Sequence, residues 1–208
     1  MTDAHAVRRA DTGDAAGIAG VIAEAFHDIP VSLWIVPDPV DRARIYPDYF
    51  RIFVDMAIPH GEVEVIDDDS GDGPAAAAVW MPVMPDPIPA PEDYDILVDK
   101  ICGQYAENFR ALDAVMERHH PHEPHHYLAL LAVRPGLQAN GLGSALLNHH
   151  HRKLDAAGIP AYLEASSVGS RALYMRHGFV PNHDPFVMVE GVPAEGGPAM
   201  WPLWRDPQ

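Results

Sequence analysis

The chain has 208 residues, and its 48% hydrophobic and 21% charged content is typical of one globular domain rather than a disordered chain. Its net charge of −16, with histidine neutral, argues against binding to nucleic acid or to an anionic membrane surface, because both depend on Lys and Arg. A single cysteine, no long apolar run and no basic-then-apolar N-terminal segment lead us to expect a cytoplasmic protein without disulfides, folded as one domain over residues 1–208.

Two helices are predicted in the first quarter of the chain. Asp11 and Thr12 are residue types that cap helices, and an apolar stripe at helical spacing follows them to about His27. A second stripe covers residues 40–56, although Pro47 lies inside it and would break a regular helix.

Three strands are predicted within the first 81 residues. Residues 7–10 are expected to form a short edge strand. Residues 62–66 and 75–81 alternate or run apolar on either side of a turn, which predicts a hairpin. Five of the 21 prolines then lie in residues 81–91, so we expect an irregular loop there.

The second half of the chain alternates helices with strands, which indicates an α/β fold. The expected elements are a helical region at 93–119 that divides into two helices, a strand at 161–165, a helix at 169–177 and two final strands near 186–189 and 199–204.

A strand, a glycine loop and a helix follow one another over residues 127–157. Residues 127–133 form an unbroken apolar run, typical of a strand buried on both faces. Residues 134–136 break the run, a helix is predicted over 144–157, and Gly158 ends it. If 161–165 pairs with 127–133 in parallel, this helix is the crossover between them.

The loop of this unit is suited to an anion. The first amides of a helix have no partner within the helix, and the helix dipole adds partial positive charge there. Gly141 and Gly143 allow a phosphate or pyrophosphate to approach the backbone. The loop has neither the Gly-Lys-Ser/Thr ending of a Walker loop nor the spacing of a dinucleotide fingerprint. An ordinary tight turn is the alternative interpretation.

Two blocks of sequence resemble the GNAT superfamily of N-acetyltransferases. Residues 138–143 fit the signature Q/R-x-x-G-x-G/A, and residues 163–179 resemble a strand-plus-helix block that ends in L-Y-x-x-x-G-F. The resemblance implies a mixed sheet of six or seven strands, flanked by helices and splayed beside Val133, where acetyl-CoA binds.

The resemblance narrows to one subfamily. Residues 25–30, 122–129 and 141–145 are similar to segments of the puromycin N-acetyltransferase subfamily. We interpret this likeness as a shared subfamily and not as a shared substrate.

The resemblance implies acetyl-CoA as co-substrate and no metal. The backbone of residues 131–133 would pair with the pantetheine arm as an added strand does, and the amides of 139–144 would hold the pyrophosphate. Many members carry Arg or Lys in this loop and Asn at the position of Ser167, whereas this chain has neither. The implied cofactor-binding residues are Leu131, Ala132, Val133, Gln138, Ala139, Asn140, Gly141, Leu142, Gly143, Ser144, Ser167 and Tyr174.

Acetyl transfer to an amine moves two protons, and two residues are candidates for these steps. The amine loses a proton to become a nucleophile, and the departing thiolate leaves more easily with one. Tyr174 aligns with the tyrosine that members use as the acid, and Glu164 stands where members often carry a base. The alternatives are a core aromatic for Tyr174 and a carboxylate satisfied by backbone amides for Glu164. An ordered water could replace Glu164 as the base.

The acceptor is expected to lie between the segment after the first helix and the start of strand 127–133. There Phe26 and Trp34 would offer apolar area, Asp28 would attract an ammonium group, and Tyr127 would close the other side. Pro30 is expected to end the helix and supply a turn. The alternative is that both aromatic residues belong to the core.

The 13 histidines cluster at 119–126 and 149–151. Without paired cysteines, we expect surface histidines there rather than a zinc site, with His126 or Tyr127 able to line the acceptor pocket. Cys102 is expected to be a buried small hydrophobic residue.

The leading hypothesis is an N-acetyltransferase for the primary amine of a small molecule, with direct attack in a ternary complex and a monomeric or homodimeric protein. A peptide or protein N-acetyltransferase, or a non-catalytic acyl-CoA-binding member, remain open. The sequence does not identify the acceptor amine.

Overall fold

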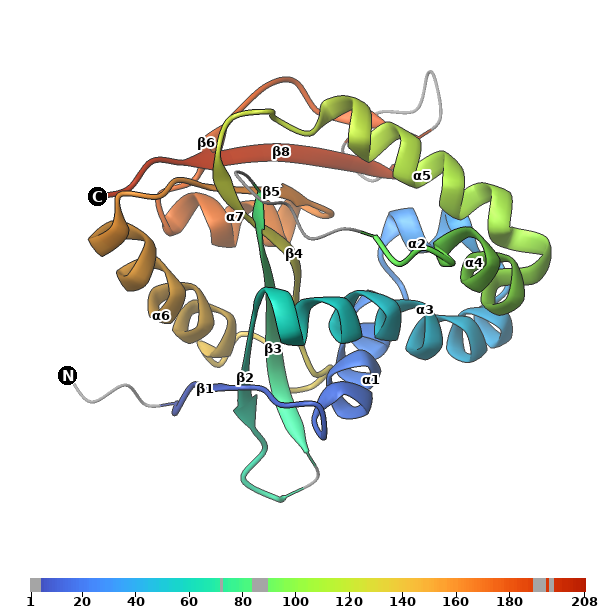
Figure 1. Cartoon of the computed structure of the whole chain (residues 1–208), viewed down its shortest axis with the longest axis horizontal. Coiled ribbons are helices and arrows are strands. Elements are labelled where there is room, and N and C mark those ends of the chain that lie inside the picture. Colours follow the sequence, from blue (N-terminus) through green and yellow to red (C-terminus); the bar gives the residue numbers. More distant parts are fainter. Residues whose placement is uncertain (1–4, 72, 84–89, 189–193, 195–196) are drawn as a thin grey trace.

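The computed structural model describes residues 5–71, 73–83, 90–188, 194 and 197–208. Within them the chain folds into one eight-stranded sheet with helices on both faces (Figure 1). No helix in these ranges is both long and apolar enough to cross a bilayer. The helices are α1 (Ala15–Phe26), α2 (Pro30–Ile35), α3 (Pro39–His60), α4 (Tyr94–Cys102), α5 (Ala106–His119), α6 (Leu142–Ala157) and α7 (Val168–Arg176), with a 3-10 turn at Gly103–Tyr105.

The strands follow the order β1-β2-β3-β4-β5-β8-β6 across the sheet, and β7 pairs with β8. Only β4 and β5 run parallel among these pairs, and α6 is the crossover between them, as predicted. The bounds are β1 (Arg8–Arg9), β2 (Glu62–Asp67), β3 (Pro74–Val83), β4 (His125–Val133), β5 (Ala161–Ala165), β6 (Val180–Pro181), β7 (Phe186–Val187) and β8 (Ala199–Arg205).

The sheet is splayed between its two parallel strands. β4 and β5 pair only at His126 with Ala161 and at Tyr127 with Tyr162. Beyond Tyr127, the described strands pair with β4 on its β3 side alone, where Ala76 is still opposite Val133. The predicted α/β sheet with a splay toward Val133 is therefore confirmed.

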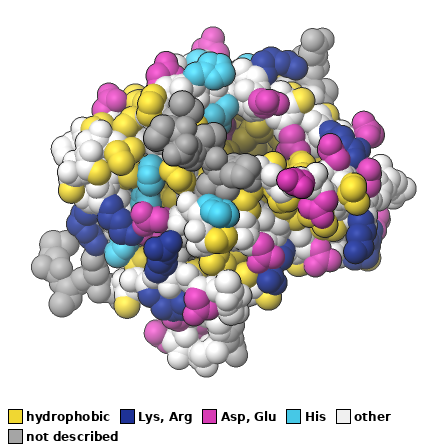
Figure 2. All heavy atoms as spheres, in the orientation of Figure 1, with side chains coloured by type: hydrophobic (Ala, Val, Ile, Leu, Met, Phe, Trp, Pro, Cys, Tyr) yellow, Lys and Arg dark blue, Asp and Glu magenta, His cyan; other side chains and the backbone are white. Residues whose placement is uncertain are grey.

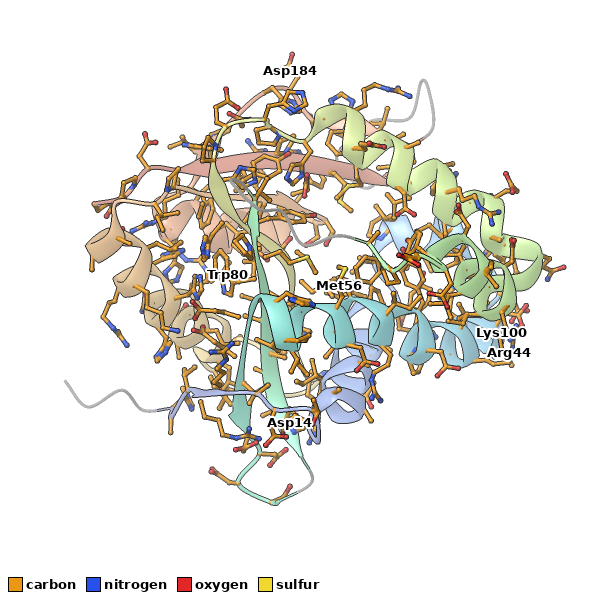
Figure 3. All side chains as sticks on the ribbon, in the orientation of Figure 1. Asp14, Arg44, Met56, Trp80, Lys100 and Asp184 are labelled. Carbon is orange, nitrogen blue, oxygen red and sulfur yellow. The ribbon has the colours of Figure 1, made fainter. Side chains whose placement is uncertain are left out.

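Two hydrophobic cores lie on opposite faces of the sheet. α1 and α3 pack on one face, in a core that also includes residues of α2, α4 and α5. α6 and α7 cover the other face. Figure 3 shows Trp80 of β3 on the α6 side, where its ring stacks on His150 at a centroid distance of 4.1 Å, while Met56 extends from α3 toward the centre of the molecule.

Three predictions in the N-terminal third need correction. The first helix begins at Ala15 after Asp14, and the Asp11 carboxylate instead accepts from the Gly13 amide in the preceding turn. Pro47 does not break α3, which continues to His60 because the aromatic residues around the proline are packed in the core. The first helix does end before Pro30, and a turn follows it at 27–29, but Pro30 itself starts α2 at the position where proline is favoured.

Three smaller differences concern the strands. β3 extends to Val83 and so includes the first three residues of the predicted proline loop; residues 84–89 of that loop lie outside the described residues. In the described part of the chain, the sheet has eight strands, one more than the upper limit expected. The strand that was not predicted is β6, whose two residues are too few to show an alternating pattern. The predicted strand at 186–189 is a strand at Phe186–Val187, and residue 189 lies outside the described ranges. The other predicted elements are present.

Candidate functional site

A cavity of about 1050 Å³ lies beside the splay of the sheet. Residues of β4, β5, α6 and α7 line one part of it, and residues of α1, α2, α3 and α5 line the other. The face in Figure 2 is hollowed, with hydrophobic side chains inside the hollow and acidic side chains along one edge. The cavity thus joins the glycine loop to the core on the α1–α3 side.

The glycine loop presents unpaired amides to this cavity. The N–H groups of Leu142, Gly143 and Ser144, at the start of α6, have no hydrogen-bond partner among the described residues. Gly141 precedes them with φ of +87°, and Ala139 is also left-handed with φ of +63°. A left-handed non-glycine residue is uncommon and costs free energy, which is typical of a backbone shaped for a ligand. Together these amides and the helix dipole form an anion-binding end.

The backbone of β4 offers a second binding edge. Its register against β3 shifts between Leu128 and Leu130, so Ala129 forms a bulge. Beyond the bulge, residues 131–133 pair with no strand on the β5 side within the described part of the chain. An extended arm with amide groups can pair with such an edge as an added strand does.

The cations near the loop in sequence are engaged elsewhere. Arg134 donates to Asp68 at 2.6 Å and to the Pro74 carbonyl at 2.7 Å. Lys153 binds Glu62 and Glu64 on the other side of α6. The cation that does line the cavity is Arg176, at the end of α7, which sequence reasoning missed although it lies inside the recognised L-Y-x-x-x-G-F block.

Ser144 is held from behind by a histidine. Its hydroxyl lies 2.9 Å from His177 Nε2, and His177 Nδ1 lies 3.1 Å from Asn148 Oδ1. Burial and the neighbouring arginines lower the pKa of His177, so the ring is neutral at pH 7. Since an amide oxygen only accepts, Nδ1 carries the hydrogen and Nε2 accepts the Ser144 hydroxyl.

Tyr174 lies on α7 with 7% of the residue exposed, and it lines the cavity. Its hydroxyl makes no hydrogen bond to any described residue. Burial raises the pKa of Tyr174 well above that of a free tyrosine, so the hydroxyl keeps its proton at neutral pH. A protonated, unengaged hydroxyl in the cavity is suited to donate a proton.

Glu164 of β5 is buried without a hydrogen bond. Its side chain is 2% exposed, it lines the cavity, and neither carboxylate oxygen has a hydrogen-bond partner within the described residues. Burial, followed by the nearby Glu164 carboxylate, raises the pKa of Tyr127 and of Tyr162. The alternative in which backbone amides satisfy this carboxylate is therefore absent from the described structure.

The acceptor residues expected from sequence are only partly brought together. Phe26, Asp28 and Tyr127 line the cavity, and Phe26 meets Phe50 edge to face at 5.4 Å. Trp34 does not line it and packs instead against the core, so the acceptor prediction narrows to the other three. The reason is that Pro30 starts α2, which turns Trp34 away from the position that a loop would give it.

Sequence reasoning missed most of the apolar wall, which comes from α3 and α5. Tyr49, Phe50, Phe53 and Phe109 line the cavity together with the Asp113 carboxylate, whose pKa burial raises. Asp113 accepts a hydrogen bond from the Tyr94 hydroxyl at 2.8 Å. The sequence predicted a helical stripe over 40–56 and a helical region over 93–119, and gave no sign of a cavity between them.

The predicted cofactor residues are also placed. Asn140 does not line the cavity, since its side chain donates to the Leu137 carbonyl at 3.2 Å. Ser167 lines the cavity but also caps α7, where its Oγ accepts from the Ser170 amide. The other predicted residues that line it are Leu131, Ala132, Val133, Gln138, Ala139, Gly141, Leu142, Gly143, Ser144 and Tyr174.

The histidines are less exposed than expected. His150 is fully buried and His125 is 2% exposed. Glu62, Glu64 and His150 bring possible metal-ligand atoms within 4.8 Å of one another. However, the Lys153 ammonium lies 2.6 Å from an oxygen of each glutamate, so it already supplies the cation of this group.

Residues 96–181 match the family described as the acetyltransferase (GNAT) domain. This range includes β4, the glycine loop, Glu164 and Tyr174. Over these residues the chain is similar to a GNAT acetyltransferase domain. It is an acyltransferase, and the family to which this domain belongs uses acetyl-CoA.

Several solved structures share the fold. A Corynebacterium glutamicum protein described as histone acetyltransferase HPA2 and related acetyltransferase is 26% identical, with 98% of this chain and 97% of that chain covered and a TM-score of 0.66. Arylalkylamine N-acetyltransferase 2 from Aedes aegypti is 10% identical, with coverage of 99% and 100% and a TM-score of 0.65. An agmatine N-acetyltransferase mutant is 17% identical, with coverage of 97% and 98% and a TM-score of 0.62.

Proposed function

We propose that the protein transfers the acetyl group of acetyl-CoA to the primary amine of a small molecule with an apolar or aromatic body. Both substrates are bound together, and the amine attacks directly. The observation that carries the proposal is one continuous cavity. It runs from the unpaired amides of α6, past Tyr174 and Glu164, to an aromatic wall.

The residues at the glycine loop fit the cofactor. The free amides at Leu142 to Ser144 and the Arg176 guanidinium would hold its pyrophosphate, and the open edge of β4 at 131–133 would pair with its pantetheine arm. When bound, the cofactor supplies an acetyl thioester, which an amine can attack. Backbone amides make up for the missing Arg or Lys of the loop.

Two side chains have complementary proton roles. The Glu164 carboxylate takes the proton of the incoming ammonium group, because it is buried, unpartnered and directed at the cavity. The Tyr174 hydroxyl donates to the sulfur that leaves, because burial keeps it protonated. A carboxylate and a phenol at separate positions of one cavity can carry out both transfers.

The acceptor end favours a cation with an apolar body. Among the described residues that line the cavity, Arg176 is the one basic residue, and the acidic ones are Glu24, Asp28, Asp113 and Glu164. Aromatic and methionine side chains form much of the rest of this end. Support also comes from the likeness to the puromycin N-acetyltransferase subfamily, and from structures similar in fold that are described as arylalkylamine and agmatine acetyltransferases.

An amine panel tests this proposal. The protein is incubated with acetyl-CoA and, in turn, arylalkylamines, an aminonucleoside, linear polyamines and peptides with a free N-terminus or lysine, and free thiol is read over time. Cys102 is buried and burial raises its thiol pKa to about 12, so it adds little background. We expect the fastest release with small amines that carry an apolar body. Release with peptides alone, or with no amine, would contradict the proposal.

A further inference from the structure

Outside the cavity lining, the nearest basic group to the Glu164 carboxylate among the described residues is a histidine. His120 follows directly after α5, and its Nδ1 lies 3.8 Å from Glu164 Oε1. Glu164 itself forms part of the cavity wall, whereas His120 does not line the cavity. The imidazole therefore stands behind the carboxylate as seen from the substrate.

Hydrogen bonds fix the hydrogen positions on two imidazoles in this group. His125 Nδ1 lies 2.6 Å from the Glu123 carbonyl, which can only accept, so Nδ1 carries the hydrogen. Burial lowers the pKa of His125, so its other nitrogen, Nε2, is an acceptor. His120 Nε2 lies 3.2 Å from it and must be the donor.

These hydrogen bonds leave one ring nitrogen of His120, Nδ1, without a partner of its own in the series. If His120 is neutral and its hydrogen is on Nε2, its Nδ1 has a lone pair directed at Glu164. A lone pair that faces a carboxylate at 3.8 Å is unfavourable until a proton comes between the two atoms. The pair is therefore arranged to receive one proton.

Exposure gives the pair a direction. The Glu164 side chain is 2% exposed, whereas that of His120 is 24% exposed. When substrates fill the cavity, a proton on Glu164 has no direct route to bulk water. A proton on the partly exposed His120 has one. The two residues thus connect the substrate side of β5 with solvent.

We propose that His120 relays the amine proton from Glu164 to solvent, a role that rests on the proposed acetyl transfer. The ammonium group gives a proton to the Glu164 carboxylate and becomes a neutral amine. Protonated Glu164 passes that proton to His120 Nδ1 and becomes a carboxylate again. The His120 imidazolium then releases one proton to water, so both groups return to their starting state with one proton moved. His120 acts through Glu164 and is a positioning residue for proton transfer.

The groups around His120 are consistent with this role. Its ring meets the Tyr127 and Tyr162 rings edge to face, at centroid distances of 4.7 Å and 5.1 Å. Both phenols remain protonated at neutral pH because burial and Glu164 raise their pKa. The titratable or charged groups near His120 are Glu164 and Tyr162 of β5, His125 and Tyr127 of β4, and His119 and Arg118 of α5.

The test compares His120→Ala with His122→Ala. His122 lies in the same loop, is exposed and makes no hydrogen bond or ion pair within the described residues, so it is a matched control. Thiol release is measured for the wild type and both variants, with an amine that the wild type accepts, from pH 7 to pH 10 and with added imidazole. Thermal unfolding and calorimetric CoA binding check that each variant is folded.

We expect His120→Ala to lose about ten- to a hundredfold in kcat at pH 7, part of the usual contribution of general acid–base catalysis. The loss should shrink toward pH 10, where more of the amine arrives neutral, and added imidazole should raise the rate of this variant alone. An unchanged kcat, or an equal loss at every pH without rescue, would overturn the relay. A wild type that acetylates no amine would instead contradict the proposed function itself, so the two failures are distinguishable.

Discussion

Two glutamates of the same sheet are equally buried and are treated in opposite ways. The side chains of Glu64 on β2 and Glu164 on β5 are each 2% exposed. Glu64 Oε1 accepts from Lys153 at 2.6 Å and from His150 at 3.2 Å. Glu164 accepts no hydrogen bond from a described residue, and its closest basic group is a histidine at 3.8 Å.

The difference separates structural from functional burial of charge. A buried carboxylate costs free energy unless a cation or donors compensate it, and the group around Glu64 supplies both. Glu164 has no ammonium or guanidinium group at hydrogen-bond distance among the described residues, so its charge is compensated less than that of Glu64. Unpaired groups of this kind are concentrated at sites where a ligand completes the environment.

Replacing Glu164 should give the largest loss of activity with no loss of stability. Glu164→Gln keeps the shape and removes the base, so kcat should fall by about 10²–10⁴-fold. Its thermal midpoint should be no lower than that of the wild type, because an uncompensated charge has been removed. Steady-state thiol release and thermal unfolding measure the two effects. A stability loss with normal turnover would reverse the roles of the two glutamates.

Tyr174→Phe tests the other proton step. The ring and its packing stay, and only the cavity-facing hydroxyl is lost, so kcat should fall by about 10²–10⁴-fold with little change in CoA affinity. The same thiol assay, with CoA titration by calorimetry, measures it. A turnover within about twofold of the wild type would remove Tyr174 as the acid.

Gly141→Val should remove CoA binding. The valine side chain would cover the amides that face the phosphate, and the φ of +87° at this position is unfavourable for any residue with a Cβ. Gly158→Val is the matched control, since Gly158 ends the same helix with φ of +67° and also has open space around it. Calorimetry should show lost binding for the first variant and wild-type affinity for the second. Equal affinity in both would contradict the placement of the pyrophosphate.

Glu64→Gln should reduce stability and leave the chemistry intact. The amide oxygen of Gln can still accept from His150, but the variant loses the negative charge that the Lys153 ammonium contacts at 2.6 Å, which should cost about 1–3 kcal/mol in free energy of unfolding. Although burial alone would raise the pKa of Glu64, hydrogen bonds from His150 and Lys153 lower it below 4.5.

The pH dependence of this loss follows from the lowered pKa. A depressed carboxyl pKa stabilises the fold above the unfolded value, and this contribution disappears as the pH falls through the folded value. The difference between wild type and Glu64→Gln should therefore be full at pH 7 and shrink below about pH 4.5. Urea unfolding of the wild type and the variant at pH 7 and below about pH 4.5 measures this difference in stability. A stability difference that grows in acid would contradict the ion-pair account.

Asp28→Asn should have the smallest effect. The Asp28 side chain is 79% exposed, so water screens its attraction for an ammonium group. We expect KM for an accepted amine to rise by about two- to fivefold with kcat unchanged, as for a surface charge. Trp34→Ala, outside the cavity lining, should leave KM unchanged, and a larger effect there would restore the wider acceptor prediction.

The cofactor end could be predicted from sequence because its parts are contiguous. The strand, glycine loop and helix were placed within two residues of β4 and α6, since an apolar run, Gly141 and Gly158 are all local signals. The acceptor end could not be predicted from sequence, because α3 and α5 come together only through tertiary packing.

Prolines were the main source of error in the elements. On the sequence alone, both prolines were treated as helix breakers. In the structure, Pro47 lies within an unbroken helix and Pro30 starts one. The role of Glu164 was equally hidden. Its sequence position could not show whether amides or a cation would satisfy the carboxylate.

The pH dependence of the Glu164→Gln defect tests the central claim most directly. The ratio of wild-type to variant kcat/KM is measured with one accepted amine from pH 7 to pH 10. If Glu164 deprotonates the ammonium group, the ratio should be largest at pH 7 and fall toward the pKa of the amine, about 10.4 for a lysine-like group. A ratio that stays constant over this range would show that the buried carboxylate does not act as the base.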